Sequence, residues 1–90
     1  MKEENKGRMI YHYYARIAWK KKRGNGYINN YKNVEFVSRA DGIEEMNRSA
    51  EFIAQIMHHN GLTGSNIHDF KVLEIMDRQE ISRSFYYKED

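Results

Sequence analysis

Four consecutive cations, Lys20-Lys21-Lys22-Arg23, are the residues of this chain best suited to bind an anionic partner. Ammonium and guanidinium groups neutralise phosphates, and the tyrosine rings near them in the sequence, Tyr14, Tyr27 and Tyr31, can stack on exposed bases. Cations beside aromatic rings predict a nucleic-acid-binding surface, with RNA favoured over DNA because single-stranded RNA presents unstacked bases. The candidate binding residues are Tyr14, Arg16, Lys20, Lys21, Lys22, Arg23, Asn25, Tyr31 and Arg39.

A second chemistry, metal-independent RNA cleavage, is compatible with one set of polar residues, His12, Tyr14, Arg16 and Lys20. On one strand face these side chains could supply a base, a phosphate clamp and an acid. Small bacterial ribonuclease toxins of similar length resemble this chain in being basic α+β proteins, but they begin with a pair of helices, whereas this chain begins with a strand. We therefore expect a non-enzymatic protein without catalytic residues, and metal-independent ribonuclease activity is a minor alternative.

No metal or cofactor site is expected from the sequence. His58 and His59 close a predicted helix, where the helix dipole favours a cation, and no pair of histidines has the i, i+4 spacing of a helical metal site. In the third predicted strand, Asp69 and Asp77 fall on one side and Glu74 on the other, so these carboxylates are not expected to converge. The absence of cysteine excludes disulfides and thiolate chemistry.

The aromatic and cationic residues lie in a segment, residues 9–22, in which apolar and polar side chains alternate. Odd positions from Tyr11 to Trp19 are apolar or aromatic, and most even positions are polar. A period of two over this length is typical of a β-strand with one buried face. The odd positions are therefore expected in the core, which leaves Tyr14, Arg16 and the four cations for binding.

Asn25-Gly26 predicts a tight type I′ turn, because both residue types accept a positive φ. A second strand then runs back to about Ser38. With Asn25-Gly26 as the two loop residues, the apolar residues of both strands share one face of the sheet. The expected cross-strand neighbours are Ile17 with Val34, Ala15 with Phe36, Arg16 with Glu35, Lys20 with Tyr31 and His12 with Arg39.

One helix is expected after the hairpin. Asp41 has the position of an N-cap, apolar residues recur at helical spacing over Ile43–Met57, and Gly61 is expected to end the helix in a left-handed conformation. A third strand follows at about residues 70–76. Residues 80–87 then form either a fourth strand or an ordered tail.

These elements predict an α+β fold, a two-layer ββαβ(β) sandwich. A right-handed crossover through the helix places the third strand next to the first and antiparallel to it, which gives the sheet order 2-1-3. One helix covers one face of this antiparallel-rich sheet, and the basic hairpin protrudes beyond it. The expected organisation is a flexible N-terminal arm at residues 1–8, a single domain at residues 9–87 and a tail at residues 88–90.

The third predicted strand has apolar residues on both faces and therefore needs a second cover. A second copy of the chain is one candidate, forming a homodimer through strand three or the C-terminal segment. The aromatic run Phe85-Tyr86-Tyr87 of the same chain is the other candidate. The sequence leaves the choice between them open.

Charge is unevenly distributed along the 90 residues, although the formal net charge is only +2. Residues 1–40 contain ten Lys/Arg against three Asp/Glu, and residues 41–90 contain five against ten. The split predicts separate basic and acidic surfaces, with an anionic ligand on the N-terminal half. No apolar run approaches the roughly 18 residues of a membrane-spanning helix, and the charged N-terminus is unlike a signal peptide, so a cytoplasmic protein without a membrane partner is expected.

The composition of the chain resembles that of small early proteins of bacteriophages, including inhibitors of CRISPR and toxin–antitoxin defences. The resemblance is carried by the length, the absence of Cys and Pro, the segment GYINNYKN and the expected short helix on a small sheet. It implies a protein of the host-cell cytoplasm that inhibits a host defence ribonucleoprotein, for example by occupying its RNA. The alternative function is that of a protein-binding inhibitor or adaptor, which docks through an exposed edge strand or through its acidic helix.

Overall fold

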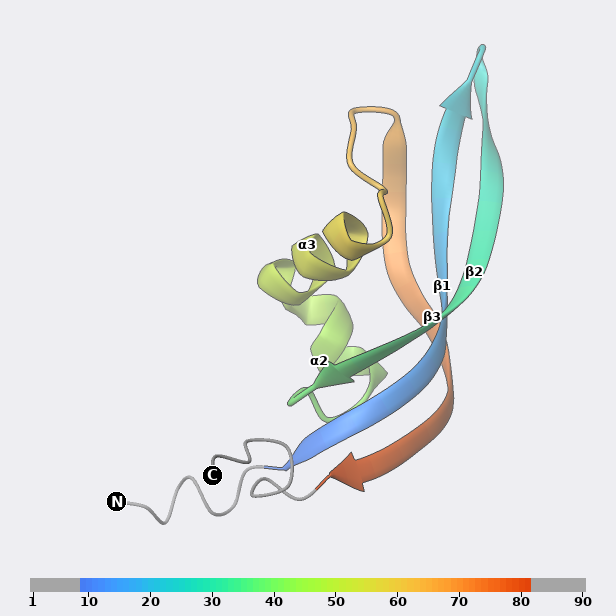
Figure 1. Cartoon of the computed structure of the whole chain (residues 1–90). Coiled ribbons are helices and arrows are strands. Elements are labelled where there is room, and N and C mark those ends of the chain that lie inside the picture. The colour runs from blue at the N-terminus through green and yellow to red at the C-terminus, as the bar shows by residue number, and fades with distance from the viewer. Residues whose placement is uncertain (1–8, 82–90) are drawn as a thin grey trace.

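The computed structural model describes residues 9–81 and has the expected α+β architecture (Figure 1). In chain order the elements are β1 (Ile10–Arg23), β2 (Gly26–Ser38), α2 (Ile43–Arg48), α3 (Ala50–His59) and β3 (Ile67–Ile81). Glu80 and Ile81, expected to begin a fourth strand, are the last residues of β3. The predicted N-terminal arm, the rest of the predicted fourth strand and the tail lie outside the described residues.

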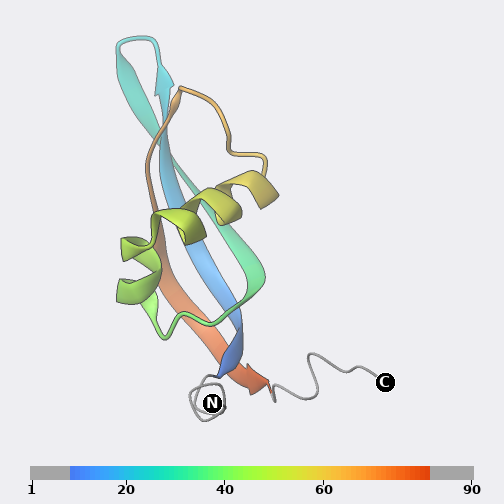
Figure 2. The same cartoon turned by 90° about the vertical axis from the view of Figure 1, so that its left-hand side faces the viewer.

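The three strands form one antiparallel sheet in the order β2-β1-β3, as predicted. β1 is the central strand and pairs with β2 on one edge and with β3 on the other. Both helices lie on the same side of this sheet, and α3 crosses in front of the strands when the sheet is viewed from that side (Figure 2). The fold is therefore a two-layer sandwich, and within residues 9–81 the second face of the sheet has no covering layer.

The alternation of side chains in β1 decides which face of the sheet is buried. Tyr13, Ala15 and Ile17, at odd positions, have no exposed surface, whereas Tyr14 between them is 38% exposed. The core consists of Tyr11, Tyr13, Ala15, Ile17, Val34, Met46, Ile56 and Val72. Burying each large apolar side chain contributes roughly 1.5–3 kcal/mol, so a one-residue slip that turned this face to water would be strongly disfavoured.

The prediction of Asn25-Gly26 as the loop residues is wrong by one position. The strands pair Arg23 with Gly26, and the loop residues are Gly24 and Asn25. Gly24 has a φ of +59°, whereas Asn25 is not among the residues with positive φ. A type I′ turn needs positive φ at both central residues, while glycine at the first of them alone is the pattern of a type II′ turn. Because the loop moves by one residue in both strands, each residue of β1 faces a residue of β2 two positions away from the predicted one. A shift of two residues preserves the alternation, so every side chain keeps its predicted face.

The shifted pairing replaces the predicted cross-strand neighbours. Arg16 lies opposite Asn33 and donates a hydrogen bond from Nε to Asn33 Oδ1 at 3.2 Å, instead of meeting Glu35. Lys20 lies opposite Asn29, and His12 opposite Val37, so the predicted pairs of these residues with Tyr31 and Arg39 are not formed. The observed pairs are Tyr13 with Phe36, Ala15 with Val34, Arg16 with Asn33 and Lys20 with Asn29.

The expected helical segment is divided into two short helices at Ser49. This residue has an extended backbone, and its hydroxyl accepts a hydrogen bond from the Phe52 N–H at 3.1 Å, which caps α3. Just before the break, the Asn47 side chain donates to the Val72 carbonyl at 2.9 Å and accepts from the Val72 N–H at 2.8 Å. At the break, α2 is therefore hydrogen-bonded to β3 through Asn47, and α3 begins with Ser49 as its N-cap.

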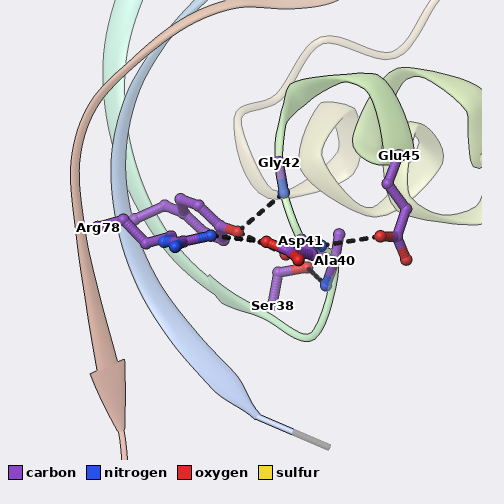
Figure 3. Close-up of polar contacts among 7 residues, drawn as sticks. Ser38, Ala40, Asp41, Gly42, Glu45 and Arg78 are labelled. Atoms are coloured by element: carbon purple, nitrogen blue, oxygen red, sulfur yellow. Dashed lines mark hydrogen bonds and ion pairs between the residues drawn. The ribbon is translucent and has the colours of Figure 1, made fainter.

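A polar cluster at the start of α2 anchors the β2–α2 connection to the sheet (Figure 3). The buried hydroxyl of Tyr13 donates a hydrogen bond to the Ala40 carbonyl and accepts one from the Gly42 N–H at 3.2 Å. Arg78 forms an ion pair with Asp41, with 2.7 Å between Nη1 and Oδ1. Because Tyr13 belongs to β1 and Arg78 to β3, the connection is held from two strands.

The predicted N-cap role of Asp41 is wrong. The N-cap residue of α2 is Gly42, and no side chain caps this helix. The Asp41 carboxylate faces Arg78 instead, and the Asp41 N–H donates to the Glu45 carboxylate at 3.0 Å (Figure 3). The Asp41 carboxylate therefore forms a long-range ion pair with Arg78 instead of capping α2, as the local sequence pattern had predicted.

Arg78 also contacts the aromatic part of the core. Its Cζ lies 4.4 Å from the centroid of the Tyr11 ring, within the range of a cation–π interaction. The Tyr13 hydroxyl and the Asp41 carboxylate raise the pKa of the Arg78 guanidinium, so its charge is maintained. Burial is the main cause of the raised pKa of the Tyr11 phenol, which therefore stays neutral in this contact.

The turn assignment can be tested with two glycine substitutions. Gly24→Ala should lower the free energy of unfolding by about 1–2 kcal/mol, because a left-handed backbone disfavours a residue with a Cβ atom. Gly26→Ala is the matched control, since its backbone is not left-handed and an added Cβ meets no atom within 4 Å. Chemical denaturation measures both variants. A larger loss for Gly26→Ala than for Gly24→Ala would support the Asn25-Gly26 loop instead.

The anchoring role of Tyr13 predicts a second stability difference. Tyr13→Phe should lower the free energy of unfolding by about 1–3 kcal/mol, because it leaves the Ala40 carbonyl and the Gly42 N–H without this partner. Tyr14→Phe removes the same atom from the exposed neighbour and should change stability by less than about 0.5 kcal/mol. Equal urea midpoints for the two variants would contradict the anchoring role.

Candidate nucleic-acid interface

The open face of the sheet, opposite the helices, consists of the even-numbered residues of β1, the odd-numbered residues of β2 and their neighbours on β3. Three tyrosines on this face, Tyr14, Tyr27 and Tyr31, are exposed. Tyr27 and Tyr31 are four residues apart, and Glu35, the partner of Tyr14, is four residues beyond Tyr31. At about 3.3 Å per residue, the rings follow one another at steps of about 13 Å along the open face.

A shallow depression lies on the open face over Ala18. In the sheet, Ala18 is directly opposite Tyr31 of β2 and Lys71 of β3. Its methyl group is much smaller than the side chains on both sides, so the surface is lowest at this position. Besides these three residues, the depression is lined by Lys20, Asn29, Asp69 and Leu73, and by Trp19, Asn30 and Phe70 next to them in the strands.

The predicted cations divide between the two faces of the hairpin. Lys20 and Lys22 lie on the open face, and Lys21 and Arg23 on the other. Lys20 is within 3.6 Å of the Asp69 carboxylate. Within residues 9–81, the other three cations of the run are in no ion pair, and Lys71 beside the depression is in none. These four side chains are therefore free to meet phosphates.

The carboxylates of β3 lie closer together than predicted. Register shifts in the β1–β3 pairing place Asp77 opposite Tyr14 and Glu74 opposite Arg16. A further register shift lies between Ala18 and Lys20 of β1, and there Asp69 of β3 has a left-handed φ of 53°. All three acidic residues therefore reach the open face, and the prediction that Glu74 points the other way is wrong. Within residues 9–81, no group of three potential metal ligands is found.

Two of these carboxylates neutralise part of the predicted basic surface. Arg16 lies 3.8 Å from Glu74, and Lys20 pairs with Asp69. All four side chains are well exposed, and such pairs typically contribute only about 0–1 kcal/mol to stability. A phosphate could therefore compete for either cation, but both start with a carboxylate neighbour.

The basic hairpin extends beyond the helices, as predicted, although β3 supports much of it (Figure 1). β3 pairs with β1 as far as Lys21, which lies opposite Ile67. The Lys22 N–H also donates to the Asn66 carbonyl at 3.0 Å. Only the last residues on either side of the turn, with Asn25 in the loop, therefore extend past the third strand.

The structure places Arg39 far from Tyr31 and the hairpin cations, with Tyr14 nearer to it than the others. Arg39 follows the last residue of β2, at the opposite end of this strand from the turn. From Tyr31 to Arg39 the chain advances eight residues, or roughly 26 Å if extended. The pairing that would have set Arg39 beside His12 does not form, because His12 is opposite Val37. Arg39 is therefore not part of the surface around the hairpin.

The residues considered for RNA cleavage do not meet at one point. His12, Tyr14, Arg16 and Lys20 share the open face, but His12 and Lys20 are eight residues apart, or about 26 Å along β1, with Tyr14 and Arg16 between them. A general acid and base must lie within hydrogen-bond reach of the same phosphodiester. The His12 imidazole instead faces the Glu35 carboxylate at 3.6 Å. These spacings do not bring all four side chains to one phosphodiester.

Sequence reasoning missed the contribution of β3 to this surface. Lys71 and Leu73 flank the depression from β3, and neither belongs to the predicted set. Leu73 falls at one of the register shifts, so simple alternation could not assign its face. Ala18 is one of the even positions of β1 and gives no binding signal in the sequence by itself. Its small size becomes informative only when the large neighbours on both sides are known.

A second concavity, the helix groove, lies between α3 and the adjoining ends of β1 and β2. Its apolar surface includes Ile10, Phe36, Phe52 and Ile56. Acidic residues near the groove are Glu35, Asp41, Glu45 and Glu51. Arg39, His58 and His59 also line the groove, so its charge is mixed, in contrast to the run of four cations in the hairpin.

Comparison of the chain with known protein families, with characterised proteins and with solved structures finds no match. Any function therefore has to be inferred from the geometry and chemistry of the surfaces themselves. Within residues 9–81, no helix has the length and apolar character needed to cross a membrane.

Proposed function

We propose that this protein binds single-stranded nucleic acid, with RNA preferred over DNA, through the open face and the basic hairpin. The observation that carries the proposal is the row of exposed tyrosines Tyr14, Tyr27 and Tyr31 on a sheet face that no element within residues 9–81 covers, beside cations such as Lys22 and Lys71 that form no ion pair within these residues. Stacking of one base on an aromatic side chain contributes about 1–3 kcal/mol. Phosphate neutralisation by the cations adds a salt-dependent term.

The distribution of charge supports a strand that runs along the sheet toward the turn. Lys22 and Lys71 provide ammonium groups near the row of rings, and Lys21 and Arg23 are close by on the other face of the hairpin. The acidic residues of α2 and α3 are on the opposite side of the sheet, so the carboxylates that would compete with the phosphates are those of the open face, Glu35, Asp69, Glu74 and Asp77. A cytoplasmic protein of this kind could inhibit a host ribonucleoprotein by occupying its RNA.

The salt dependence of binding tests the role of the cations. Replacing Lys20, Lys21, Lys22 and Arg23 together by alanine should weaken binding of a single-stranded oligoribonucleotide, measured by fluorescence anisotropy. The slope of log affinity against log salt should fall in magnitude by about 0.7 for each phosphate that the variant no longer neutralises. No binding of mixed RNA or DNA by the unmodified protein at low salt would refute the proposal.

Matched single substitutions separate a local effect from a change in net charge. Lys22→Ala removes one charge from the open face, and Arg48→Ala removes one from the exposed surface of α2. We expect a lower affinity and a smaller salt slope only for Lys22→Ala. Equal effects of the two variants would indicate attraction by net charge alone.

Removing a competing carboxylate should have the opposite effect. Asp69→Asn frees Lys20 from its ion pair, and asparagine tolerates the left-handed backbone at this position. We expect affinity for the oligoribonucleotide to rise severalfold at low salt and less at high salt, as the interaction is screened. Glu51→Gln in α3 is the control, since it neutralises one carboxylate away from the open face. An equal increase in both variants would contradict the role of Asp69.

The second candidate function, a protein-binding inhibitor or adaptor, is favoured by the helix groove. Its apolar surface, with both carboxylates and basic side chains around it, would suit a segment with apolar and charged side chains. The exposed edge of β2 offers a further docking mode by strand addition. Isolation of a defined protein rather than nucleic acid with the purified chain, together with loss of that complex on Phe52→Ala, would favour this function.

A further inference from the structure

We propose that the depression over Ala18 is a subsite for one unpaired nucleobase, which stacks against Tyr31. This inference rests on the proposed function and makes it more specific, because it assigns a position on the open face to a single base. It also requires a single-stranded ligand, since the faces of bases in a duplex are covered by their stacked neighbours.

The free surface of Tyr31 distinguishes it from the other tyrosines. It is 60% exposed, the highest exposure of any large hydrophobic side chain described. Tyr27, in contrast, has its ring in an edge contact with His68, with centroids 5.2 Å apart. Within residues 9–81, Tyr31 has no aromatic partner. A ring without such a partner can accept a base on its surface.

Most of the remaining side chains around the depression complement a nucleotide, whereas the Asp69 carboxylate, which pairs with Lys20, opposes a phosphate there. The Ala18 methyl provides an apolar floor, and Leu73, which is 41% exposed, provides an apolar side chain on the β3 side. The Asn29 amide can donate to or accept from the edge of a base. Lys20 and Lys71 can reach phosphates on either side of it. An aromatic ring, an apolar floor and two ammonium groups thus lie within one small area.

Cross-strand geometry explains why the depression occurs at this position. Ala18 is in the central strand, so a large neighbour stands on each side, Tyr31 from β2 and Lys71 from β3. It is only 8% exposed although no described helix covers it, because these neighbours rise above it. A larger residue at this position would fill the depression without changing the charge of the open face.

Ala18→Leu therefore provides the main test. Binding of a 5′-fluorescein-labelled mixed-sequence oligoribonucleotide is measured by anisotropy, and circular dichroism checks that the variant is folded. We expect affinity to fall about tenfold, on the scale of the stacking of one base, with an unchanged salt slope because every phosphate-binding cation is retained. Ala54→Leu on the exposed surface of α3 is the matched control and should leave affinity unchanged.

Two further variants keep the test decisive if Ala18→Leu fails to fold. Tyr31→Leu should weaken binding about tenfold as well, whereas Tyr31→Phe should retain it because the stacking surface remains. A fully paired RNA duplex of the same sequence should be affected much less by either Ala18→Leu or Tyr31→Leu. Equal losses for the duplex and the single strand would overturn the subsite.

The outcomes distinguish the subsite from the broader function. If the unmodified protein binds the single strand but Tyr31→Leu binds it equally well, the subsite is wrong and the proposed function stands. If the unmodified protein binds no single strand at low salt, the proposed function fails, and the subsite fails with it. Selective losses in Ala18→Leu and Tyr31→Leu would support both.

Discussion

The central strand β1 constrains the whole arrangement, because it contributes to both the core and the proposed binding surface. Its odd positions place Tyr13, Ala15 and Ile17 under the helices, so its even positions must face the opposite way. The polarity of the even positions then decides the character of the open face. Tyr14 and Arg16 lie there because their neighbours are in the core, and Ala18 lies there between two larger neighbours.

The contacts that hold the helical layer are separate from the proposed binding surface. Tyr13 and Arg78 bind the connection before α2, and Asn47 bonds to the backbone of β3 at Val72. None of these side chains lines the depression, and none of the candidate binding residues belongs to the core cluster. Binding and stability should therefore respond to different substitutions, which makes the proposed surface accessible to mutagenesis.

Local sequence patterns predicted the architecture, because alternation and helical spacing report burial directly. The faces of β1 and β2 and the sheet order were predicted correctly, whereas the loop was placed one residue late because Gly24 and Gly26 both flank Asn25. The division of the helix at Ser49 combines a local cap, Ser49 to the Phe52 N–H, with a tertiary bond from Asn47 to β3 that the local pattern does not report. The register shifts that bring Leu73 to the open face likewise arise from pairing, which a linear pattern does not contain.

The most direct test of the account uses the tyrosine rings themselves. The protein carries exposed and buried tyrosines, so ring ¹H–¹³C chemical shifts during titration with a single-stranded oligoribonucleotide contain their own control. We predict large shifts for Tyr14, Tyr27 and Tyr31, largest for Tyr31, and small shifts for the buried Tyr11 and Tyr13. Shifts confined to the aromatic rings of the helix groove, or no shift at any ring at low salt, would contradict binding on the open face.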